Sequence, residues 1–238
     1  MMRRSARNAA ERAIVYKLCS LALQYPDEEL VAGRAELASA AADLHRCAAA
    51  DALGRFFAWF SRATPLELAQ HYVQTFDLHK RSALYLTFYS LGDRRDRGLA
   101  LLRLKRLYRA AGFPLDGSEL PDYLPLMLEF AAAAAPDKGR LVLSEHRAAL
   151  ELVRLALHEQ QSPYAHALDA VCEQSGRLSA AERLGLDRLL THGPPHELVG
   201  LEPLGAARSA SDLAQRRAVP ESPGSRPEVI PTTTGARR

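Results

Sequence analysis

Two carboxylates embedded in apolar sequence are the residues of this chain best placed for binding chemistry. Asp122 lies between Pro121 and Tyr123, and Glu129 lies beside Leu128 and shortly before a run of alanines. The two are seven residues apart, so a helix would place them on nearly the same face. A carboxylate in apolar surroundings needs a cation or hydrogen-bond donors. Together they could form the acidic floor of an apolar groove that receives a basic amphipathic peptide.

Each carboxylate also has a purely structural explanation. Asp122 precedes a helical stretch and is of the residue type that caps helices. Glu129 belongs to a helix that is apolar nearly all round, which predicts that its side chain is buried. An arginine from the basic segment 94–109 could pair with it there. The sequence leaves the internal ion pair and the ligand-binding role of Glu129 as open alternatives.

Tyrosines gather in the same part of the chain, between residues 71 and 129. A buried tyrosine needs a partner for its hydroxyl, and several together suit a cleft with one wet side. The wall of such a cleft and an ordinary core are both compatible with their spacing. The tyrosines concerned are Tyr72, Tyr85, Tyr89 and Tyr123.

Catalytic and metal-binding motifs do not emerge from the sequence. It contains no phosphate-cradling glycine loop of the P-loop or dinucleotide type and no G-x-S-x-G nucleophile motif. His192 and His196 have the spacing of zinc ligands on a helix, but Pro194 and Pro195 lie between them and break any helix there. The three cysteines are far apart and form no CxxC pair. We therefore predict a protein that is not an enzyme and needs no cofactor or metal.

The overall composition is that of a soluble globular protein. Of the 238 residues 47% are hydrophobic and 25% charged, and the net charge is only +3. A nucleic-acid-binding protein would carry a larger and more clustered positive excess. No apolar run reaches the roughly 20 residues that span a bilayer, and the basic N-terminus lacks the apolar core of a secretory signal. We expect a cytoplasmic protein with no nucleic-acid partner and no direct membrane insertion.

The elements that must position these residues are helices. Apolar residues recur at helical spacing over residues 7–24, which end before Pro26. A capping box predicts a helix start at Thr64, and a second one predicts a start at Ser179. Residues 82–90 are compatible with a further helix, and residues 123–135 predict the helix that carries Glu129. A single helix is expected from Asp27 to Leu44. Pro136 and Asp137 separate the Glu129 helix from a long helix that is expected to extend through Gln160.

We therefore predict an all-α fold, a single-domain bundle of about eight or nine helices over residues 6–190. Residues 191–238 are rich in Pro, Gly, Ser, Thr and Arg and show little apolar periodicity. That composition predicts a disordered C-terminal tail.

The acidic, tyrosine-rich stretch resembles the NarJ family, the delta subunit or molybdenum cofactor assembly chaperone of respiratory nitrate reductase. The resemblance is dense over residues 71–130 and extends from about 11 to 190. It is carried by YVQTFD at residues 72–77, LYLT at 84–87, GD at 92–93, RGLALLRLK at 97–105 and ELPDYLPLMLEF at 119–130.

The resemblance implies an all-helical fold like that of the TorD and DmsD chaperones. It implies binding of the N-terminal segment of the alpha (catalytic) subunit, support of molybdenum cofactor insertion before membrane docking, and contact with proteins of molybdenum cofactor biosynthesis. The alternative is a proofreading chaperone that reads the twin-arginine signal peptide of another molybdoenzyme. The implied peptide groove is lined by Tyr72, Phe76, Asp77, Tyr85, Tyr89, Asp122, Tyr123 and Glu129.

Overall fold

The computed structural model describes residues 2–92, 95–115, 117–133 and 136–194. Within these ranges the chain is all-α, as predicted, with one isolated β-bridge and no strand. Nearly all of the predicted C-terminal tail, from residue 195 onward, lies outside the described residues. The helices are α1 (Met2–Ala22), α2 (Glu28–Ala32), α3 (Arg34–Ala42), α4 (Ala48–Phe60), α5 (Pro65–Tyr72), α6 (Leu86–Leu91), α7 (Arg95–Ala110), α8 (Leu124–Ala133), α9 (Pro136–Glu145), α10 (Arg147–Glu159), α11 (Ala165–Ser175) and α12 (Ala180–His192).

Side-chain caps begin the helices where the sequence predicts them. The Thr64 hydroxyl accepts a hydrogen bond from the Glu67 amide at 3.3 Å, and the Glu67 carboxylate accepts one from the Thr64 amide at 2.8 Å. Ser179 and Glu182 form the same reciprocal box at the start of α12. These bonds satisfy amides that the first turn of a helix leaves without partners.

The described residues contain twelve α-helices rather than eight or nine, and two of the additional helices arise because two predicted long helices are each divided. Gly33 separates α2 from α3, and His146 separates α9 from α10. Apolar periodicity continues across both breaks, so the sequence pattern alone predicts one helix at each place.

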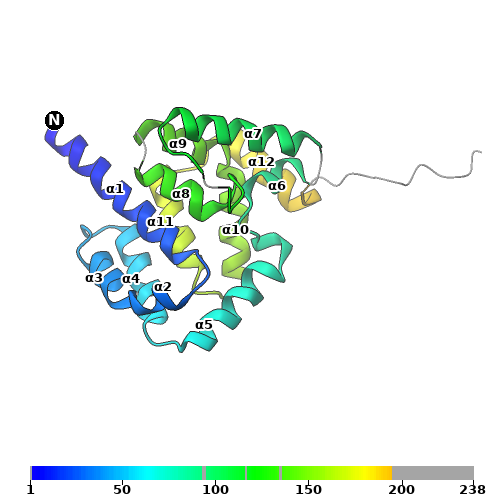
Figure 1. The fold of residues 1–238 in the computed structure, drawn as a ribbon. Helices are drawn as coiled ribbons and strands as arrows, with labels where there is room; N and C mark the ends of the chain where they lie inside the picture. The colour runs from blue at the N-terminus through cyan, green and yellow to red at the C-terminus, as the bar shows by residue number, and fades with distance from the viewer. Residues whose placement is uncertain (1, 93–94, 116, 134–135, 195–238) are drawn as a thin grey trace, which may run out of the picture. The chain divides into compact units, whose positions relative to one another are not determined.

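The C-terminal half of α1 packs on α8, α11 and α4, whereas its N-terminal part projects away from the other helices (Figure 1). The Ser20 hydroxyl on α1 donates to the Pro125 carbonyl at 2.7 Å and so ties α1 to the start of α8. Phe56, Phe57 and Tyr164 are among the largest fully buried side chains and join α4 to the start of α11. Aromatic side chains of this size contribute a large share of the apolar area that a core buries.

Irregular backbone occupies the segment between α5 and α6. Residues Val73–Asp77 form a π-helix, in which the Leu78 amide donates to the Val73 carbonyl at 3.2 Å. A single 3₁₀ turn, Lys80–Ser82, follows. The predicted helix over 82–90 forms only from Leu86, because the backbone at Leu84 and Leu86 pairs with that at Asp122 and Leu124. π-helical turns are rare and occur often at functional sites.

Candidate functional site

A pocket of about 440 Å³ lies where the π-helix meets the β-bridge. Its volume is within the range of binding pockets for small groups. Five of the eight predicted groove residues line it, namely Tyr72, Phe76, Asp77, Tyr85 and Tyr123, and Ala83, Leu84 and Glu119 complete it. We call this the tyrosine pocket.

The β-bridge presents two of its tyrosines side by side. The Leu86 amide donates to the Asp122 carbonyl at 3.0 Å, and the Leu124 amide donates to the Leu84 carbonyl at 2.7 Å. Tyr85 and Tyr123 are therefore directly opposed, with ring centroids 5.4 Å apart. Opposed residues of an antiparallel pair project to the same side, so both rings form one wall of the tyrosine pocket.

The second wall comes from the end of α5 and the π-helix. The Tyr72 and Tyr123 hydroxyls are 3.0 Å apart, and Tyr72 also donates to the Leu23 carbonyl at 3.3 Å. The Phe76 ring lies 4.9 Å from that of Tyr72. Burial raises the pKa of Tyr72 and of Tyr123, so both phenols stay neutral near neutral pH.

Two carboxylates give the tyrosine pocket its charge. Asp77 is exposed and Glu119 is half-buried. In the part of the chain that the structure describes, no Lys, Arg or His forms an ion pair with either of them. The Tyr85 hydroxyl donates to the Glu119 Oε1 at 3.1 Å. Burial, and then the neighbouring charge of Glu119, raise the pKa of Tyr85 to about 12.

Exposed apolar side chains surround the tyrosine pocket. The Tyr25 ring contacts that of Tyr72 at a centroid distance of 5.4 Å, and half of the Tyr25 side chain is exposed. Val73 and Leu120, next in sequence to the lining residues Tyr72 and Glu119, are also exposed. The arrangement can accept an apolar side chain in the pocket and cationic side chains at its two carboxylates.

Three of the predicted groove residues lie outside the tyrosine pocket, and the first is Tyr89. Its side chain is fully buried, and its hydroxyl donates to the Ala83 carbonyl at 2.9 Å. Tyr89 is thus part of the core that supports the 80–83 turn. Of the two alternatives, cleft wall and ordinary core, Tyr89 belongs to the core.

Asp122 is the second, and its predicted role as the cap of the following helix is wrong. Its side chain is 0% exposed and accepts hydrogen bonds from the Thr87 amide, at 3.3 Å, and from the Thr87 hydroxyl. Its Oδ2 also lies 3.3 Å from an Nη2 of Arg97. Asp122 therefore caps α6, which is distant in sequence, and pairs with an arginine of α7.

Glu129 is the third, and the prediction that it is buried is wrong. Its side chain is 36% exposed, and its Oε1 lies 2.6 Å from Nζ of Lys17 on α1. Although α8 is apolar nearly all round, α1 covers it from one side and leaves Glu129 at the edge of that contact. The cation that meets it is a lysine of α1, not an arginine of the 94–109 segment.

Glu119 lines the tyrosine pocket but is not among the predicted groove residues, although it belongs to the ELPDY run. The only signal in the sequence is weak. Glu119 lies two residues before Pro121, and a carboxylate beside such a turn is usually reached by solvent and therefore open to a ligand. The π-helix had no recognisable pattern, since residues 66–76 keep ordinary helical spacing.

A metal centre is not evident in the described residues, since no group of three or more His, Cys, Asp or Glu side chains there could hold a metal ion. None of the helices in the described ranges is long and apolar enough to cross a membrane.

Comparison with known protein families assigns this chain to one of them. The model of the nitrate reductase delta subunit family matches residues 34–170, more than half of the chain. The chain belongs to this family. The match spans the whole tyrosine pocket and most of the helices that support it.

Relatives of the delta subunit family show how far the similarity extends. A probable nitrate reductase molybdenum cofactor assembly chaperone, NarJ of Bacillus subtilis, is 35% identical over 75% of this chain and 94% of its own. The NarJ chaperone of Escherichia coli K12 is 32% identical over 64% of this chain and 65% of its own. The nitrate reductase-like protein NarX of Mycobacterium tuberculosis is 42% identical over 67% of this chain, which spans only about a quarter (24%) of the length of that relative.

A solved structure supports the fold of this delta subunit family member. A putative redox enzyme maturation protein from Archaeoglobus fulgidus superposes with a TM-score of 0.52 at 22% identity, over 69% of this chain and 94% of that protein. The similarity confirms the predicted all-α architecture of the maturation-protein type.

Proposed function

We propose that this protein is an assembly chaperone for a respiratory nitrate reductase. In this role it binds the N-terminal segment of the alpha (catalytic) subunit in the tyrosine pocket. It holds that subunit ready for insertion of the molybdenum cofactor, before the enzyme docks on its membrane partner. Family membership and the chaperone names of the relatives from Bacillus subtilis and Escherichia coli support the proposal.

The observation that carries the peptide-binding part is the pair of carboxylates in the tyrosine pocket. Asp77 and Glu119 flank an aromatic pocket, and neither is paired with a cation within the described ranges. A helical peptide that presents an apolar side chain with a Lys or Arg one turn away complements this arrangement. The apolar contact supplies binding free energy, and the charges supply specificity.

The role is not enzymatic and is placed in the cytoplasm, where the catalytic subunit folds before it reaches the membrane. The partners are the unassembled alpha subunit and the proteins of molybdenum cofactor biosynthesis that deliver the cofactor to it. The chaperone needs no bound cofactor of its own, since its task is to hold the client.

Calorimetric titration of the full-length chain with a synthetic peptide of the alpha subunit N-terminus tests the proposal. We expect binding that weakens as salt is added, because charge pairs at a partly exposed site are screened. The double substitution Asp77→Asn with Glu119→Gln should weaken binding about tenfold, roughly the loss of two exposed or half-exposed pairs. Both changes keep the side-chain shape, so the fold should be unaffected.

Asp187→Asn is the matched control, because Asp187 is an exposed carboxylate of α12 without an ion pair in the described residues. Equal affinities for wild type and the double variant would show that the tyrosine pocket does not bind the peptide. Absence of any binding would remove the alpha subunit as the client.

A second client class fits the same two carboxylates. Asp77 and Glu119 could each pair with one arginine of a twin-arginine signal peptide, which would make the protein a proofreading chaperone for another molybdoenzyme. Competition between the two peptides decides between the clients. Displacement of the alpha subunit peptide by a twin-arginine peptide, but not by one with both arginines changed to glutamine, would favour this alternative.

A further inference from the structure

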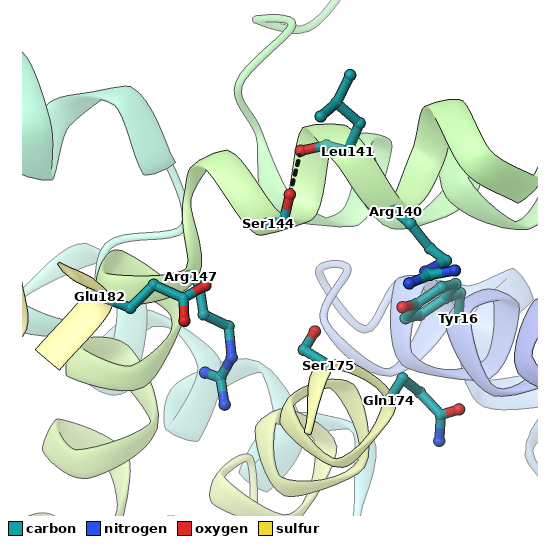
Figure 2. A pocket seen from close by; sticks show the side chains of 8 residues that line it. All are labelled: Tyr16, Arg140, Leu141, Ser144, Arg147, Gln174, Ser175 and Glu182. Carbon is teal, nitrogen blue, oxygen red and sulfur yellow. Dashed lines mark hydrogen bonds between the residues drawn. The ribbon is translucent and has the colours of Figure 1, made fainter. Parts of the chain in front are cut away.

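A second pocket, of about 350 Å³, is lined by side chains from α1, α9, α10, α11 and α12 and is unrelated to the tyrosine pocket (Figure 2). Its chemistry differs, because it combines two arginine side chains and neutral hydrogen-bonding groups with a single carboxylate. The residues that matter here are Tyr16, Arg140, Arg147, Gln174, Ser175 and Glu182. We call this the arginine pocket.

Arg140 supplies a positive charge that the described residues do not neutralise. Its guanidinium forms no ion pair and no hydrogen bond with them. Arg12, one turn before Tyr16 on α1, also forms no ion pair within the described ranges, and its Nε is buried without a hydrogen-bond partner. Arg140 lines the arginine pocket, and the charge of Arg12 acts on the lining residue Tyr16, so two arginines without carboxylate partners in the described residues give this side of the site a positive potential.

Tyr16 is a nearly buried hydrogen-bond donor that lines the arginine pocket. Its side chain is 2% exposed, and its hydroxyl forms no hydrogen bond with the described residues. Burial raises the pKa of Tyr16, whereas Arg12 and then Arg140 act to lower it. The first effect prevails, so the phenol keeps its proton and can donate it to a bound acceptor.

Arg147 forms a fixed part of the wall. Its side chain is 5% exposed, and its Nη1 lies 3.0 Å from the Glu151 carboxylate while its Nη2 donates to the Gly176 carbonyl at 3.3 Å. The Nε remains buried without a partner. Because the guanidinium is held by its terminal nitrogens and paired with Glu151, Arg147 forms a rigid part of the wall, and the unpaired charge of the arginine pocket comes from Arg140.

Glu182 limits where an anion can bind. It lies beside Arg147 at one side of the arginine pocket, while Tyr16 and Arg140 lie at the other (Figure 2). The capping box with Ser179 fixes the Glu182 carboxylate, lowers its pKa and keeps it charged. An anion is therefore favoured next to Tyr16 and Arg140, with Gln174 and Ser175 available as neutral donors.

From this geometry we infer that the arginine pocket binds a small molecule bearing phosphate groups. Phosphate oxygens accept hydrogen bonds from guanidinium, phenol, amide and hydroxyl donors, all of which line this site. The volume exceeds that needed for a single phosphate ion, so the ligand class is a phosphorylated small molecule rather than free phosphate.

Titration of the full-length chain with inorganic pyrophosphate, by calorimetry and thermal shift, tests the inference. Arg140→Gln should weaken pyrophosphate binding at least tenfold, because a charge-assisted contact is lost. Tyr16→Phe should weaken it several-fold. Glu182→Gln should tighten binding, because it removes a repulsive charge and still caps α12. That gain is the result that a merely destabilised fold would not produce.

Arg188→Gln is the control, since Arg188 is an exposed arginine of α12 outside the arginine pocket and should leave binding unchanged. Sulfate at equal ionic strength separates specific binding from screening. No binding of pyrophosphate at millimolar concentration would overturn the inference. So would equal losses in Arg140→Gln and Arg188→Gln, or equal binding of sulfate and pyrophosphate.

Discussion

Asp122 and Glu119 lie three residues apart in the same ELPDY run, yet their surroundings are opposite. Asp122 is fully buried and bonded to Thr87 and Arg97. Glu119 is half-buried and, within the described residues, accepts hydrogen bonds only from the Tyr85 hydroxyl and its neighbouring Leu120 amide. The side-chain bonds of Asp122 all go to its Oδ2, and its buried Oδ1 has no hydrogen-bond partner in the described residues. The difference shows that a buried carboxylate bonded to its own chain holds the fold, whereas one without a cation is available to a ligand.

Helix positions explain why the two residues diverge. The backbone bridge between Leu84–Leu86 and Asp122–Leu124 places Asp122 at the start of α6. Arg97, on α7, lies at the same place. The Tyr108 hydroxyl holds the Pro121 carbonyl at 2.8 Å and fixes the turn just before it. Glu119 precedes that turn and therefore lies at the tyrosine pocket instead of in the core.

The largest expected effect comes from removing the buried carboxylate of Asp122. Asp122→Ala should lower the free energy of unfolding by about 3 kcal/mol, because it removes the buried acceptor of the Thr87 amide and breaks the Asp122–Arg97 ion pair. Urea denaturation measures the change. Asp187→Ala, at an exposed position of α12, should change it by less than about 0.5 kcal/mol. Similar losses in both variants would contradict the assignment of Asp122 to the core.

A smaller effect is expected inside the tyrosine pocket. Tyr123→Phe removes the hydrogen bond between the Tyr123 and Tyr72 hydroxyls and should cost about 1 kcal/mol of unfolding free energy. The loss stays small because Tyr72 keeps the Leu23 carbonyl as its acceptor. Tyr25→Phe is the matched control, since the structure gives the exposed Tyr25 hydroxyl no hydrogen bond to the described residues. A loss above about 3 kcal/mol would place Tyr123 in the core rather than in a pocket wall.

Glu129 should matter least for stability. Its pair with Lys17 is largely exposed on both sides, so Glu129→Gln should change the unfolding free energy by no more than about 0.5 kcal/mol. Because Glu129 does not line the tyrosine pocket, we also expect nearly unchanged peptide affinity in calorimetry. If Glu129→Gln weakened the peptide as much as Glu119→Gln does, the binding surface would have to extend along α8 to α1.

The final prediction concerns the ionisation of Tyr85. Glu119→Gln should lower the pKa of Tyr85 from about 12, while burial keeps it above the ordinary value. A folded-state pKa above the unfolded one means that the native protein holds the proton more tightly, so stability falls as pH rises between about 10 and 12. Ultraviolet titration at high pH, compared with Tyr85→Phe, isolates this phenol. An unchanged titration in Glu119→Gln would contradict the Tyr85–Glu119 contact.

Much of the fold and half of the site could be predicted from the sequence. The capping boxes at Thr64 and Ser179 depend on residues three apart and form as expected. The grouping of Tyr72, Phe76, Asp77, Tyr85 and Tyr123 in one pocket agrees with the stretch singled out in the sequence. The breaks at Gly33 and His146 could not be predicted, because the apolar spacing runs through them without interruption.

The sequence by itself determined the helical class, the helix starts and the concentration of tyrosines and carboxylates in one stretch, because these depend on neighbours within a turn or two. Only the tertiary structure decided which carboxylate is buried with Arg97, which is paired with Lys17 and which is left at the tyrosine pocket. Those outcomes depend on where α1, α6 and α7 pack. A charge's partner can come from any helix that packs beside it, and residue spacing within one helix carries no information about that partner.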